Sequence, residues 1–65
     1  MVSAQNLSTL RRGETIEARH PWSGHYRGKI ESLVPHKGIL WIQHGPFNER
    51  KLIDSIEYQI WRSPG

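Results

Sequence analysis

Residues 13–62 read GETIEARHPWSGHYRGKIESLVPHKGILWIQHGPFNERKLIDSIEYQIWR, and this stretch decides the fold. It contains five short β-prone runs that are joined by turns and not by long helices. Strands this short and this close together have to curl into a small barrel to cover their edges. The sequence therefore predicts an all-β, five-stranded barrel with strands at residues 14–19, 26–34, 39–44, 49–53 and 58–61.

Side-chain alternation predicts which face of the first strand is buried. Ile16 and Ala18 share one face, and Glu17 and Arg19 share the opposite face. This period of two residues is typical of a strand with one buried face. A barrel of this size is filled by its own side chains, so we expect any binding site to lie on its outside.

The second strand alternates in the same way until its last third. Arg27 and Lys29 fall on the outer face, while Ile30 falls on the inner face. Strict alternation would place Leu33 on the polar outer face, which is unfavourable for a large apolar side chain. We therefore predict a bend or β-bulge near Ser32.

The third strand is apolar on both faces. Leu40 and Ile42 share one face, and Ile39 and Trp41 share the other. This pattern is expected of a central strand, or of a strand whose outer face meets a partner. Trp41 therefore has three possible roles: a base-stacking residue, part of a dimer or partner surface, or a core residue if the alternation is reversed.

The segment before the last strand predicts a single helical turn. Asp54 and Glu57 have the spacing of a capping box, and the β-prone residues that follow limit the turn to one 3₁₀ turn. Residues 13–62 are predicted to form one domain. Residues 1–12 are mostly small and polar and predict a flexible arm, and residues 63–65 predict a frayed end.

Composition limits the possible functions. The chain has 65 residues, no cysteine and a formal net charge of +3, so no disulfide or thiolate metal site can stabilise it. The basic balance favours an acidic partner such as DNA or RNA. No apolar run is long enough to cross a bilayer, and the first residues do not have the pattern of a signal peptide, so we expect a cytoplasmic protein without membrane contact.

The order of four strands, one helical turn and a last short strand is that of SH3-like barrels, and within this group the chain resembles Tudor-type domains. The matching segments are Gly13–Arg19 with Gly, Glu, Ile, Ala and Arg in place, Gly24–Ile30, the turn at residues 45–48, and residues 53–56. The resemblance implies binding of methylated Lys or Arg in an aromatic cage, binding of nucleic acid, or contact with a protein. By position, Trp22, Tyr26 and Phe47 resemble the cage residues and form the candidate peptide site.

The leading functional prediction is a non-enzymatic module that binds DNA or RNA on the outer face of its sheet. Aromatic side chains beside cations stack bases and contact phosphates. Arg27, Lys29 and Trp41 are the principal candidates, helped by Lys37, Arg50 and Lys51. The alternative is a Tudor-like protein-interaction module, and self-association is a further possible use of the same face.

No arrangement of residues predicts catalysis, a metal or a cofactor. The chain has four histidines, His20, His25, His36 and His44, but their spacing does not define a metal site. Residues 41–44 also resemble the pore strand of a plasmid-borne type of dihydrofolate reductase that builds its active site from four SH3-like barrels. That alternative predicts a stable tetramer, whereas a binding module does not require one.

Overall fold

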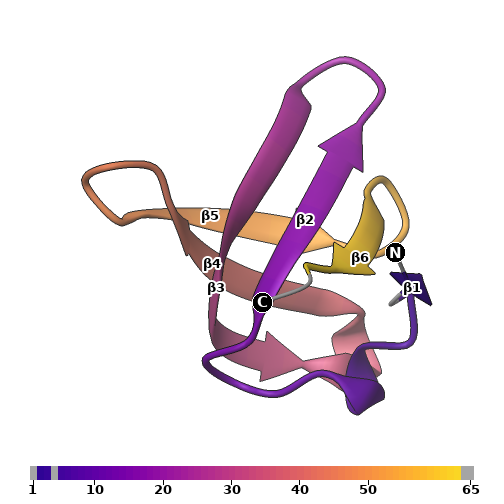
Figure 1. Ribbon diagram of the computed structural model, residues 1–65. Helices are drawn as coiled ribbons and strands as arrows, with labels where there is room; N and C mark the ends of the chain where they lie inside the picture. Colours follow the sequence, from indigo (N-terminus) through magenta and orange to yellow (C-terminus); the bar gives the residue numbers. More distant parts are fainter. Residues whose placement is uncertain (1, 4, 64–65) are drawn as a thin grey trace.

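The computed structural model describes residues 2–3 and 5–63 and is all-β (Figure 1). Five antiparallel strands match the five predicted ones, and a two-residue strand precedes them. In chain order the strands are β1 (Val2–Ser3), β2 (Thr15–His20), β3 (Gly24–Val34), β4 (Ile39–His44), β5 (Glu49–Asp54) and β6 (Gln59–Arg62). Two short 3₁₀ segments, η1 (Leu7–Thr9) and η2 (Pro35–Lys37), lie between them.

The strands form one antiparallel sheet in the order β1-β6-β2-β3-β4-β5. Figure 1 shows the β2–β3 hairpin crossing the β4–β5 strands, because β3 bends sharply along its length. Within the described residues, the hydrogen-bonded ladder does not close between β1 and β5. The single sheet therefore coils to enclose its own core, with its two outer strands unjoined.

The inner face of the coiled sheet forms the core, and on β2 it is the face that alternation predicts to be buried. Ile16 and Ala18 on β2 and Leu40 and Ile42 on β4 are fully buried. The other buried apolar residues are Leu7, Leu10, Ile30, Ile53, Tyr58 and Ile60. Trp41 lies on the outer face, so the reversed alternation that would have placed it in the core is wrong.

A β-bulge occurs where it is predicted. The register between β3 and β4 shifts between Ile30 and Ser32, which leaves Glu31 as the extra residue. The shift places Leu33 opposite Leu40, on the side of the core. Glu31 itself stays on the outer face of the sheet, and only part of it is exposed to solvent.

The prediction of a flexible N-terminal arm is wrong for residues 5–10. Leu7 and Leu10 are buried in the core, and the Asn6 side chain caps η1 by accepting a hydrogen bond from Ser8 N. The physical reason is the small size of the sheet, whose core needs these two extra apolar side chains to be covered. Ser63 N donates to Thr15 O at 3.0 Å, and the rest of the predicted frayed end, residues 64–65, lies outside the described residues.

The turn that precedes β6 has the predicted Asp54 cap. Asp54 Oδ1 accepts hydrogen bonds from Ile56 N at 3.0 Å and Glu57 N at 2.7 Å. Tyr58 N donates to Asp54 O at 3.1 Å, which closes the turn over four residues instead of the three of a 3₁₀ turn. No helix in the described part of the chain is long and apolar enough to cross a membrane.

Candidate functional site

A polar pocket lies on the outer face of the sheet, where β3 extends beyond the end of β4. Its volume is about 330 Å³. We call it the β3–β4 pocket, and it is lined by Thr15, Arg27, Gly28, Lys29, Gln43, His44, Gly45 and Asn48. Gly28 allows the two strands to approach closely here, since a Cβ atom at this position would overlap the Gln43 carbonyl.

The β3–β4 pocket carries two cations and no carboxylate. Arg27 and Lys29 occupy alternate positions on β3, so both project from its outer face, and both are exposed. Arg27 Nε donates to Ser63 Oγ at 3.1 Å, which orients the guanidinium. Glu17 lies opposite Arg27 on β2, but its Oε1 is 3.1 Å from His25 Nε2. The described structure shows no ion pair for Arg27 or Lys29, so their charges remain available to a ligand.

The strand register extends this pocket into a row of polar side chains across four strands. Lys29 lies between Thr15 on β2 and Gln43 on β4, and Gln43 lies opposite Arg50 on β5. Directly opposed residues on one face have Cβ atoms about 4.5–5.5 Å apart. The two cations at Lys29 and Arg50 therefore lie on the same surface with one carboxamide between them.

Arg50 is held over Trp41 at the end of this row. The guanidinium carbon of Arg50 is 4.5 Å from the centroid of the Trp41 ring, and Arg50 Nε is 2.9 Å from Glu31 Oε1. Gln43 Nε2 donates to the other oxygen of the same carboxylate at 3.1 Å. Trp41 is partly buried beneath the guanidinium. We call Trp41, Arg50 and Glu31 the Arg50 stack.

The structure places the two remaining basic candidates elsewhere. Lys37 is exposed on η2, outside the lining of the β3–β4 pocket. Lys51 alternates with Arg50 and so projects from the opposite face of β5, where its Nζ is 5.0 Å from the centroid of the Tyr26 ring. Four of the six predicted nucleic-acid residues, Arg27, Lys29, Trp41 and Arg50, thus lie on one face.

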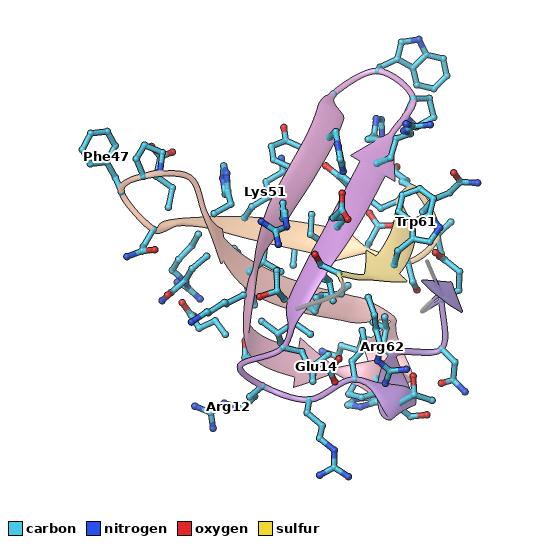
Figure 2. The ribbon with its side chains drawn as sticks, viewed as in Figure 1. Arg12, Glu14, Phe47, Lys51, Trp61 and Arg62 are labelled. Carbon is cyan, nitrogen blue, oxygen red and sulfur yellow. The ribbon has the colours of Figure 1, made fainter. Side chains whose placement is uncertain are left out.

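The three candidate cage aromatics do not come together. Trp22 is 89% exposed in the β2–β3 loop and Phe47 is 82% exposed in the β4–β5 loop. Figure 2 shows Phe47 at the tip of its loop, pointing away from the sheet. Tyr26 packs against His44 and Tyr58, and its hydroxyl donates to Ser23 O at 3.1 Å. The ammonium of Lys51 lies over the Tyr26 ring, at a position that a bound cation would need.

Sequence reasoning missed Gln43 and Asn48 as parts of this surface. Alternation does place Glu31 on the same face as Arg27 and Lys29, where its negative charge counts against nucleic-acid binding, but it does not reveal the contact of Glu31 with Arg50. Gln43 alternates with Trp41 on the outer face of β4, so the period of the strand contains the signal that identifies it. Asn48 lies in a turn and has a φ of 52°, a left-handed conformation that asparagine tolerates. The direction of its side chain depends on the type of turn, so strand alternation could not identify it. In residues 2–3 and 5–63, no three His, Cys, Asp or Glu side chains converge as a metal site would require.

Comparison of the chain with protein-family models, with curated proteins and with solved structures finds no match in any of the three.

Proposed function

We propose that this protein binds nucleic acid and that the β3–β4 pocket receives its phosphates. The observation that carries the proposal is the lining of the pocket, which combines Arg27 and Lys29 with the carboxamides of Gln43 and Asn48 and includes no carboxylate. Cations supply most of the affinity for a phosphate backbone, while carboxamides can hydrogen-bond to phosphates, sugars or base edges. An acidic small molecule would satisfy the same cations, but the row of side chains extends well beyond one pocket.

Both cations suit a phosphate ligand. Arg27 is held by Ser63 Oγ through its Nε alone, so the N–H groups of its two terminal nitrogens remain available to a ligand. A planar guanidinium with two outward N–H groups suits a phosphate, and a lysine ammonium adds a mobile point charge. The formal net charge of +3 favours approach of a polyanion from any direction.

For the fold, we infer an SH3-like barrel, closest to Tudor-type domains. The support is the order of five antiparallel strands, the strongly bent β3 and the Asp54-capped turn before β6. The interior is filled by apolar side chains, and the β3–β4 pocket lies at the surface of the sheet. This arrangement supports a binding module instead of an enzyme.

The proposal is tested by measuring affinity for DNA and RNA oligonucleotides against salt concentration. Arg27→Gln/Lys29→Gln removes two cations that neutralise phosphates, so it should weaken binding at least tenfold at low salt. The slope of log K against log salt should fall by about 0.7–0.9 for each phosphate that is no longer neutralised. The control is Arg11→Gln/Lys37→Gln, which removes the same charge from exposed positions outside the pocket and should leave the slope nearly unchanged. No binding by the unmodified protein at low salt would refute the proposal.

The exposure of Trp22 favours a second candidate function, a protein-interaction module. An indole that is 89% exposed in a loop offers a large apolar surface of the kind that is enriched at protein interfaces. An NMR titration with peptides, methylated and unmethylated, should then shift the signals of Trp22 and its neighbours in the β2–β3 loop. If these signals stay still while the β3 signals respond to oligonucleotides, the second candidate is removed.

A further inference from the structure

Resting on the proposed nucleic-acid function, we infer that the ligand is single-stranded and that one of its bases stacks on the Arg50 stack. The inference assigns different roles to the cations of the outer face. Arg27 and Lys29 hold phosphates, whereas Arg50 presents a flat surface to a base. Glu31 is a positioning residue, since it acts through Arg50.

The charge of Arg50 is already compensated. Its Nε lies 2.9 Å from Glu31 Oε1, and a phosphate that approached the guanidinium would also approach this carboxylate. Like charges at short range oppose each other, so the Glu31 carboxylate disfavours a phosphate here. Arg27 and Lys29 have no such carboxylate in their pocket. The outer face thus has two distinct sites: the β3–β4 pocket, which is positively charged, and the Arg50 stack, which has little net charge.

The guanidinium of Arg50 is preorganised for stacking. It is fixed from below by the Trp41 ring at 4.5 Å and from the side by Glu31, and Gln43 Nε2 holds the second Glu31 oxygen at 3.1 Å. Glu31 lies at the β-bulge, as the unpaired extra residue of β3. The Arg50 side chain is still 57% exposed, which leaves part of it open to solvent. Bases stack on guanidinium planes as they do on aromatic rings.

The position of the Arg50 stack next to the β3–β4 pocket selects a single strand. Lys29 and Arg50 are separated by two strand spacings, or about 10 Å. At a stacked rise of about 3.4 Å, roughly three nucleotides of one strand cover this distance. In a duplex the base faces are occupied by neighbouring pairs, so a duplex could use the phosphate site but not the stacking site.

The experiment compares three kinds of ligand of equal length on the unmodified protein. They are a single-stranded decamer, tested as both DNA and RNA, an abasic decamer, and a duplex. Fluorescence anisotropy at low salt gives each affinity. A single stacked base is worth about 1–3 kcal/mol, so the base-containing strand should bind roughly 5- to 150-fold more tightly than the abasic strand. The abasic strand carries the same phosphates and isolates the contribution of the base.

Two variants then test the Arg50 stack directly. Arg50→Lys keeps the charge and removes the flat guanidinium, so single-strand affinity should fall to nearly the abasic level while abasic and duplex affinities stay within about twofold. Glu31→Ala makes the protein more positive, yet it should weaken single-strand binding because Arg50 loses its anchor. Its control, Glu49→Ala, makes the same change of charge at an exposed β5 position outside the stack and should leave binding equal or tighter.

The outcomes separate this inference from the proposed function. If the duplex and the abasic strand bind as tightly as the single strand, and Arg50→Lys has no effect, the stacking site is wrong while phosphate binding stands. Tighter single-strand binding by Glu31→Ala would also overturn it, because simple electrostatics would then account for the surface. If no oligonucleotide binds, the proposed function itself fails.

Discussion

Gln5 Oε1 accepts a hydrogen bond from the backbone N of Ile60 at 2.6 Å, which joins the two ends of the described chain. The Gln5 amide also donates to Ser55 O at 2.8 Å and Tyr58 O at 3.1 Å. The exposed Gln5 side chain therefore makes three hydrogen bonds to the backbone of the turn and of β6. These contacts fix the segment that carries Leu7 and Leu10 into the core.

We expect Gln5→Ala to lower the free energy of unfolding by about 1–2 kcal/mol. A typical hydrogen bond contributes a net stability of about 0.5–1.5 kcal/mol, and the three bonds of Gln5 should contribute less than their sum because water can replace Gln5 at this exposed position. Urea denaturation followed by fluorescence measures this change. Gln59→Ala is the matched control, since Gln59 is an exposed glutamine of β6 with no side-chain hydrogen bond in the described structure. Equal midpoints for the two variants would show that the Gln5 contacts do not stabilise the fold.

Leu10→Ala tests directly whether the N-terminal segment belongs to the core. Leu10 is 5% exposed, and truncation of a buried leucine costs about 2–5 kcal/mol. In a domain of 65 residues this is a large share of the total stability, so the thermal midpoint should fall steeply or the cooperative transition should be lost. Thr9→Ala, at an exposed neighbouring position, should have a much smaller effect. A flexible arm would make the two variants alike.

Gly28→Ala should damage both the fold and the β3–β4 pocket. The added methyl group would overlap the Gln43 carbonyl, which is backbone and cannot move aside cheaply. Overpacking of this kind costs about 1–3 kcal/mol or more. Circular dichroism against temperature measures the decrease in stability. An unchanged midpoint would mean that β3 and β4 are farther apart at this position than the structure has them.

His20 should control the order of the loop that carries Trp22. Its Nδ1 accepts hydrogen bonds from Trp22 N and Ser23 N, each at 3.1 Å, so the loop needs an acceptor at this atom. We expect His20→Ala to raise amide hydrogen exchange at both residues by about tenfold, the equivalent of about 1.4 kcal/mol. His36→Ala, at an exposed position on η2, is the control. Unchanged exchange in His20→Ala would contradict this role.

The three tryptophans should differ in their access to a soluble quencher. Trp22 is 89% exposed, while Trp41 and Trp61 are partly buried, and Arg50 lies over the Trp41 ring. Trp22→Phe should therefore remove most of the acrylamide-sensitive fluorescence, and Trp41→Phe should remove little of it. If Trp41→Phe has the larger effect, the guanidinium does not cover that ring in solution.

Alternation along the strands predicted much of the fold because each buried face is a local pattern. It placed Ile16 with Ala18 on a buried face, and the misplaced Leu33 indicated the bulge; it grouped Leu40 with Ile42 but left open whether their face or that of Trp41 is buried. Leu7 and Leu10 were not predicted to be buried, since isolated apolar residues in a polar segment have no period. Their burial depends on how the sheet coils, which is a property of the whole chain.

The candidate site was predictable only in part. Arg27 and Lys29 follow from alternation on one strand, and the structure places both beside one pocket. The contact between Glu31 and Arg50 joins β3 to β5 across β4, so no local pattern contains it. Trp22 and Phe47 project from different loops, and the direction of a loop is set by tertiary contacts that sequence spacing does not report.

The position of β5 at the edge of the sheet has a consequence for aggregation. Within the described residues β5 is hydrogen-bonded to β4 alone, so its other edge could template the addition of a foreign strand and lead to fibres. The strand opens with Glu49, Arg50 and Lys51, and consecutive charges of this kind act as gatekeepers against such growth. Neutralising these charges would therefore convert an edge that resists fibril elongation into one that promotes it.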